Sequence, residues 1–292
     1  TIQHVAQAVV SVTPQRYGAP ANGVDDDAPA VIAALAEHDD VYLPPGTYRF
    51  GSVIALASGK ALWSDPGKAV VTIPAAAFTM SGAVEARLHG LSLVGPHSGT
   101  SYQIVLTDCV DCEVDVSLRD GNSGVNLIRS TGCRVVLAAS ELRATGIRLT
   151  GASRNYVALL GGRNIGGFGV YLSLDGATPS TDNEIIAEKY ADAATLTTYQ
   201  ASGADGSAFY NAATGRIGLE ALGITVGNNR NKILRVKALD TKDNGVSITS
   251  DYNTGGNITA SNCDNDGLHL YGSYNAMAGV VSVRNAQSGI AA

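Results

Sequence analysis

A unit of about 22 residues recurs along this chain of 292 residues, and each copy opens on a glycine followed by an apolar, a polar and an apolar residue. Three consecutive copies read GITVGNNRNKILRVKALDTKDN, GVSITSDYNTGGNITASNCDND and GLHLYGSYNAMAGVVSVRNAQS, and they start at Gly223, Gly245 and Gly267. Further copies open at Gly124, Gly146 and Gly169. A unit this short is too small to close its own core, so the copies must stack on one another.

The alternation within each unit has the period of two that is typical of a strand with one buried face. Stacked coils would lie about 4.8 Å apart, with parallel strands hydrogen-bonded from one coil to the next. We therefore predict an all-β fold, a right-handed parallel β-helix. We attribute the opening glycine of each unit to a corner with positive φ, where a side chain would be strained.

Composition narrows the class of protein further. The net charge is −6 and the Lys and Arg residues form no cluster, which argues against binding to nucleic acid or to an anionic membrane. No apolar run reaches the length of a membrane span. Cys109 and Cys112 form a single C-x-x-C without a second pair or a nearby His. Cys133 follows one unit later, so we predict stacked, buried thiols.

The segment from Arg16 to Phe50 predicts a cap for the solenoid. An acidic run, Asp25 to Asp27, and Pro29 precede an apolar stripe of Val31, Ile32 and Leu35, which indicates a short amphipathic helix over the open first coil. Val41 to Leu43 would form the first strand.

We divide the chain into a lead-in (1–15), a cap with the first coil (16–50) and the β-helix (51–292). About 32 extra residues after the Gly169 unit predict one large loop insertion around 190–222, which would wall one side of a groove. The last unit stops at GIAA, just after its start. We therefore expect a longer natural chain or a covering subunit, and a homotrimer is compatible with this end.

The motif YGA…NGVDDDAPAVIAALA…VYLPPGTYRF resembles the opening of the pectate-lyase-like β-helix proteins. That superfamily includes phage tailspike depolymerases, polygalacturonase-type hydrolases and mannuronan C5-epimerases. The resemblance implies a carbohydrate substrate and an extracellular or virion-associated location, and it does not specify the reaction.

Stacking converts sequence register into columns of neighbouring side chains. Asp243 and Asp264 should face each other across adjacent coils, with Asp266 beside them, which would supply the two carboxylates that glycoside hydrolysis uses. The alternative is that these acids are ordinary corner residues that bond the local backbone. His269 and Tyr271 would lie on the solvent face one strand step away, as base and acid or as surface cover.

Further outward positions suggest substrate contacts. Arg148 and Tyr171 could bind a uronate carboxylate and a sugar ring, or be a solvated Arg and a packed Tyr. Ser247 and Thr249 occupy the same outward columns nearer the acids. His4, His38, His89 and His97 fit no ligand spacing, and we interpret them as structural or surface residues. No metal site or other cofactor is predicted; calcium would need a ligand cluster, and the acids form no clear one.

Departures from the superfamily's motifs keep the reaction open. Asn265-Asp266-Gly267 is similar to the first element of the polygalacturonase motif, but Gln287 and Ser288 stand one coil later in place of its acid pair. The favoured interpretation is a depolymerase of the tailspike type or a bacterial relative that cleaves an extracellular or capsular polysaccharide. It would act by hydrolysis or, alternatively, by β-elimination with His269 or Tyr271 as base. A non-catalytic glycan-binding adhesin or structural shaft would also fit this sequence, and so would a uronan C5-epimerase.

Overall fold

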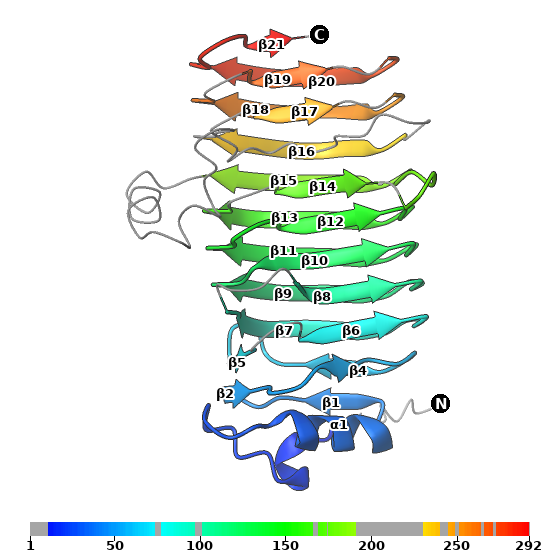
Figure 1. The fold of residues 1–292 in the computed structure, drawn as a ribbon, viewed down its shortest axis with the longest axis vertical. Coiled ribbons are helices and arrows are strands. Elements are labelled where there is room, and N and C mark those ends of the chain that lie inside the picture. The colour runs from blue at the N-terminus through cyan, green and yellow to red at the C-terminus, as the bar shows by residue number, and fades with distance from the viewer. Residues whose placement is uncertain are drawn as a thin grey trace, which may run out of the picture.

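The computed structural model describes residues 11–73, 77–96, 101–165, 169–173, 175–190, 230–239, 245–248, 251–263, 266–270 and 273–291. These residues form a stack of parallel coils with one α-helix at the N-terminal end (Figure 1). The predicted parallel β-helix is therefore confirmed. The insertion predicted around 190–222 lies outside the described residues, apart from its first residue.

Three sheets run along the stack, and the paired strands in each are parallel. The long sheet consists of β1 (Asp40–Tyr42), β4 (Ala61–Trp63), β7 (Arg87–Val94), β9 (Glu113–Arg119), β11 (Arg134–Ser140), β13 (Tyr156–Arg163), β15 (Glu184–Tyr190), β16 (Lys232–Leu239), β18 (Thr254–Ser261) and β20 (Ala276–Val283), with β2 (Gly46–Arg49) and β5 (Ala69–Thr72) beside it.

The second sheet contains the shorter strands of the first coils: β3 (Ile54–Ala55), β6 (Phe78–Ser81), β8 (Tyr102–Thr107), β10 (Ser123–Ile128), β12 (Ile147–Thr150) and β14 (Val170–Ser173). A third sheet, β17 (Val246–Ile248), β19 (Leu268–Leu270) and β21 (Ile290–Ala291), continues the short strands towards the C-terminus (Figure 1). Strand alternation holds as predicted. In β11, Val135, Leu137 and Ala139 are buried in the core, and the residues between them face outwards.

The N-terminal helix lies over the first coil as predicted, and its position depends on a buried carboxylate. A short 3-10 helix, η1 (Pro14–Tyr17), precedes α1 (Ala28–Glu37). Val31 and Leu35 join the core, whereas Ile32 is 43% exposed, so the predicted stripe is wrong at that position. Asp27 makes no side-chain cap. Its buried carboxylate accepts the backbone N–H of Ala21 and of Arg49, which ties the entry segment to β2.

The prediction about the opening glycines is wrong in its physical reason. The φ angles of Gly146 and Gly245 are not positive. A Cβ on Gly146 would lie 2.5 Å from the carbonyl oxygen of Gly169 in the next coil, and one on Gly245 would lie 2.7 Å from that of Gly267. The repeat therefore keeps glycine because adjacent coils approach too closely for a side chain.

Positive φ occurs instead at the corner before most strands of the long sheet, and non-glycine residues occupy many of these positions. They include Asp111, Arg154, Asp182, Tyr252 and Tyr274, with φ between 53° and 58°. Such a conformation is uncommon for non-glycine residues. The positive φ recurs from coil to coil because it turns the chain so that the next residue points into the core.

An internal ladder of side chains follows that corner. The positions before successive long strands are Cys112, Cys133, Asn155, Asn183, Asn231, Asn253 and Asn275, most of them buried. The predicted burial of the thiols is confirmed, and all four cysteines are free. Asn155 donates from Nδ2 to Asn183 Oδ1 at 3.0 Å, and Asn183 donates to Asn231 Oδ1 at 3.0 Å. The amides thus link the C-terminal coils through the core.

Candidate functional site

The short strands place the predicted outward residues in columns. Asn126, Arg148 and Tyr171 pair across β10, β12 and β14, and Ser247 pairs with His269 across β17 and β19. These pairings confirm the predicted register. Asp243, Asp264, Tyr271 and Thr249 lie outside the described residues.

Arg148 and Tyr171 are in contact. The Arg148 guanidinium carbon is 5.4 Å from the centre of the Tyr171 ring, and Arg148 Nε donates to Ser173 Oγ at 3.0 Å. Tyr102 on β8 belongs to the same cluster. Burial raises the pKa of its phenol, while hydrogen bonding with Thr145 and the nearby Arg148 oppose that rise. Both the guanidinium and the Tyr171 ring stay half-buried, so the cluster offers a cation beside an aromatic face.

The repeat pattern did not reveal Tyr102. Tyr102 pairs with Ser123, so Gln103 stands where the following coil has Gly124. Without the opening glycine, this coil does not match the repeat unit. Ser247 differs from expectation in accessibility: it holds its predicted register but is only 7% exposed.

Asp266 and His269 form a hydrogen-bonded pair near the C-terminal end. His269 Nδ1 lies 2.8 Å from Asp266 Oδ2, and the backbone N–H of Ser288 donates to Asp266 Oδ1 at 3.0 Å. The Asp266 side chain is 7% exposed and that of His269 is 26% exposed. Burial alone would raise the pKa of Asp266, but the hydrogen bonds from His269 and Ser288 outweigh it and lower that pKa. Asp266 is therefore a fixed carboxylate that orients the imidazole.

The pKa of Asp266 predicts how stability depends on pH. Its pKa is lowered on folding, so the carboxylate stabilises the folded state above the ordinary value of 3.8 and loses this effect as pH falls through the lower folded value. We expect Asp266→Asn to reduce the free energy of unfolding by about 2 kcal/mol near neutral pH. Urea unfolding of both proteins between neutral and strongly acid pH measures this difference. A difference that does not shrink at acid pH would contradict the assignment.

The two clusters lie on the same side of the solenoid but not at one point. The strand β14 leads into β15 and β19 leads into β20, and β15, β16, β18 and β20 are consecutive neighbours in the long sheet. Three coils therefore separate Tyr171 from His269, a distance of about 14 Å. Only an elongated ligand lying along the solenoid could contact both.

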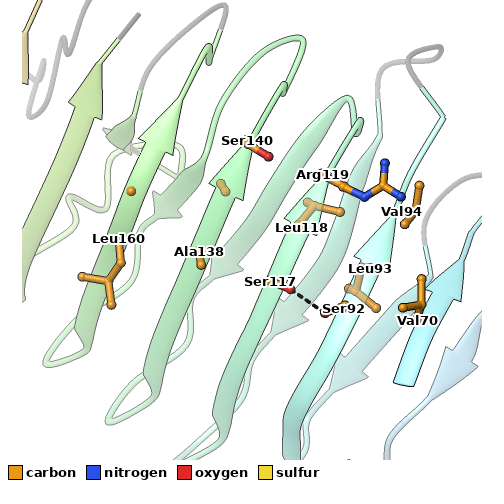
Figure 2. Close-up of a pocket in the computed structure, with 12 residues that line it drawn as sticks. Val70, Ser92, Leu93, Val94, Ser117, Leu118, Arg119, Ala138, Ser140 and Leu160 are labelled. Atoms are coloured by element: carbon orange, nitrogen blue, oxygen red, sulfur yellow. Dashed lines mark hydrogen bonds between the residues drawn. The ribbon is translucent and has the colours of Figure 1, made fainter. Parts of the chain in front are cut away.

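A separate groove crosses the outer face of the long sheet. Two adjoining depressions of about 400 and 370 Å³ share Ser117, Ala138 and Leu160. Figure 2 shows the first, with Leu160, Ala138, Ser117, Ser92 and Val70 in a row across neighbouring strands. We call the two depressions together the long-sheet groove. The sequence pattern predicts no groove here, and His89, which lines the groove, is interpreted from it as a structural or surface residue.

Among the described residues, no three or more His, Cys, Asp or Glu side chains gather as a metal ion would require. Over the same ranges, no helix has the length and apolar character needed to span a membrane.

The family model described as "Rhamnogalacturonase A/epimerase, pectate lyase-like" matches residues 9–157, about half of the chain. The chain belongs to this family. The comparison with curated proteins finds no match.

Several solved structures share the fold. ORF18 of Geobacillus virus E2 is 15% identical with a TM-score of 0.67, and the match covers 96% of this chain and 62% of the phage protein, less than two thirds of its length. The A-module of the mannuronan C-5 epimerase AlgE6 from Azotobacter vinelandii is 16% identical with a TM-score of 0.55, covering 94% of this chain and 75% of that one. The catalytic domain of a GH87 alpha-1,3-glucanase in complex with nigerose is 12% identical with a TM-score of 0.55, covering 89% and 54% respectively.

Proposed function

We propose that the protein is a polysaccharide depolymerase that cleaves uronate-containing chains by β-elimination, with His269 as the base. The observation that carries this proposal is the buried Asp266 carboxylate, 2.8 Å from His269 Nδ1. A carboxylate in that position holds the Nδ1–H tautomer and leaves Nε2 as the basic nitrogen. The family, whose description includes epimerase and pectate lyase-like, supports a carbohydrate substrate.

In the proposed step, His269 Nε2 removes the proton from C5 of a uronate residue. The electron pair of that C–H bond forms the double bond between C4 and C5, and the bond from C4 to the glycosidic oxygen breaks. The departing oxygen takes a proton from solvent, and His269 returns its proton to water. The products are a new reducing end and an unsaturated uronate, with no change in overall oxidation state.

Arg148 and Tyr171 act at a distance from that step. The guanidinium binds a uronate carboxylate and the Tyr171 ring packs on a sugar further along the same chain, about three coils from His269. Their role is to hold an extended substrate in register with the base. The phage protein among the structural neighbours supports an extracellular or virion-associated location.

Asp266 fits hydrolysis less well than elimination. A general acid in glycoside hydrolysis must carry a proton at working pH, whereas the hydrogen bonds of Asp266 lower its pKa. Hydrolysis by Asp243 and Asp264 stays a prediction from the sequence. The uronan C5-epimerase is the second candidate, because the same proton abstraction followed by reprotonation on the opposite face gives epimerisation.

Product analysis on a panel of uronate-containing and capsular polysaccharides tests the proposal. We expect the ultraviolet absorbance of an unsaturated sugar to grow together with new reducing ends. Reducing ends without that absorbance would indicate hydrolysis, and a changed uronate configuration in uncut chains would indicate epimerisation. Binding without any chemical change would indicate a glycan-binding protein, and each of these three outcomes would overturn the proposed elimination.

A further inference from the structure

We infer that the long-sheet groove is a second saccharide site, and that it takes a neutral oligosaccharide with Trp63 at one end. The site is separate from Asp266 and His269, since it lies on the outer face of another sheet, in the N-terminal half of the solenoid. The inference does not depend on the proposed elimination.

The shape of the groove suits an extended chain. Its lining comes from β5, β7, β9, β11 and β13, so the groove runs along the solenoid axis across the strands (Figure 2). Val136, Ala138 and Leu160 give it an apolar floor, and Ser92 and Ser117, joined by a 3.0 Å hydrogen bond, add hydroxyl groups. Apolar surface with a few placed polar groups is the usual composition of a ligand site.

An aromatic pair marks one end of the groove. Tyr42 and Trp63 have ring centres 4.5 Å apart, and Trp63 pairs in register with His89, which lines the groove. Carboxylates fix both rings: Trp63 Nε1 donates to Asp40, and the Tyr42 hydroxyl donates to Asp65. Both rings stay half-exposed, so they present a rigid, amphipathic surface to a sugar at little entropic cost.

A buried hydroxyl at the same end lacks a protein partner. Ser64, next to Trp63, is 4% exposed and lines the groove, and its Oγ makes no hydrogen bond within the part of the chain that the structure describes. Buried polar groups normally have a partner. The turn that carries Ser64 packs closely against β7 at Gly90, where a Cβ would overlap the Ser64 carbonyl oxygen. The φ of Gly90 is +73°.

The charges around the groove favour a neutral ligand. Each ionisable side chain that lines it has an ionisable partner: His89 lies 3.2 Å from Glu113, Asp115 pairs with Arg134 at 3.7 Å, and Arg119 pairs with Asp120 at 2.6 Å. The groove therefore offers no excess positive charge to a polyuronate. Hydroxyl groups and apolar sugar faces match what it presents.

Trp63 supplies the test, because it is the only tryptophan in the chain and its fluorescence reports on this end of the groove. We expect linear neutral glucose or galactose oligosaccharides to change its emission in a saturable way. Ala138→Phe, which places a ring in the exposed middle of the groove, should weaken that binding by about tenfold or more. Thr254→Phe, at an exposed position on β18 of the same sheet, should leave it unchanged.

Each other outcome contradicts the inference. If no neutral oligosaccharide alters the emission, the groove is not a saccharide site. If uronate oligomers alter it and neutral ones do not, the ligand class is wrong. If Ala138→Phe and Thr254→Phe bind equally well, the ligand lies elsewhere. His269→Asn should retain the fluorescence response, which separates this result from any failure of the proposed elimination.

Discussion

Replacement of His269 by asparagine is expected to lower the kcat of polysaccharide cleavage about a thousandfold, within the range that a general base contributes. The asparagine amide can still donate a hydrogen bond to Asp266, so the buried carboxylate keeps a partner. The variant loses the second ring nitrogen, which is the base in the proposed step. The rate at which the absorbance of the unsaturated product increases, compared between the two proteins, measures this loss of kcat.

Arg148→Gln is the comparison for this variant. Arg148 is proposed to bind substrate about three coils from the base, so its loss should raise KM more than it lowers kcat. If His269→Asn retained near-normal kcat, the base would be another residue. If both variants lost kcat equally, the assignment of binding to Arg148 and of proton abstraction to His269 would be wrong.

The stacking of the coils was predictable because each coil has nearly the same length. Residues about 22 apart in the sequence therefore lie side by side in adjacent coils. Register pairs such as Asn126 with Arg148, and Ser247 with His269, follow directly from the spacing of the opening glycines. The pairing of Asp266 with His269 rests on proximity in the chain, since the two residues lie three apart across the boundary between two units. Its hydrogen bond to Ser288 depends on a coil that the pattern located correctly.

The reason for those glycines was not predictable from a single coil. Local rules assign glycine to positive φ, whereas Gly146 is required by the carbonyl oxygen of Gly169, a contact between coils. Residue types that usually avoid positive φ, such as Tyr252, occupy the actual corner. Contacts between stacked coils determine which positions have a positive φ. These contacts cannot be inferred from the sequence of a single unit.

The long-sheet groove escaped prediction for a related reason. Neighbouring long strands shift register between His89 and Ser92, between Ala138 and Ser140, and between Leu159 and Gly162. Such bulges bend a strand, and the depressions lie beside them. A bulge adds one residue to a strand, and because the turns also vary in length, the spacing of the units does not show that the extra residue lies in a strand.

The asparagine ladder was hidden by uneven spacing. Asn155 and Asn183 are 28 residues apart, and Asn183 and Asn231 are 48 apart, because the sequence has extra residues between these positions. Only Asn231, Asn253 and Asn275 keep the spacing of 22. The side chains of Asn155, Asn183 and Asn231 nevertheless stack, each amide bonded to the next.

The second prediction with a large expected effect concerns stability, and it rests on the hydrogen bonds of Asn183 in this ladder. Asn183 Oδ1 accepts hydrogen bonds from the backbone N–H and from Nδ2 of Asn155, both at 3.0 Å. Asn183 Nδ2 donates to the carbonyl oxygen of Ala152 and to Asn231 Oδ1, both at 3.0 Å. Asn183 is fully buried, so no water replaces these partners when the amide is removed. The backbone N–H of Asn155 would then be buried without an acceptor.

We expect Asn183→Ala to reduce the free energy of unfolding by about 4 kcal/mol, since each buried group left unsatisfied costs about 1–3 kcal/mol and a cavity adds to the loss. Asn126→Ala is the matched control, because Asn126 is half-exposed and its side chain accepts one 3.3 Å hydrogen bond from Thr150. That control should cost less than about 1 kcal/mol. Urea unfolding followed by far-ultraviolet circular dichroism measures both. Equal losses in the two variants would show that the ladder contributes no more than a surface hydrogen bond, and a folded Asn183→Ala protein with unchanged stability would refute its structural role.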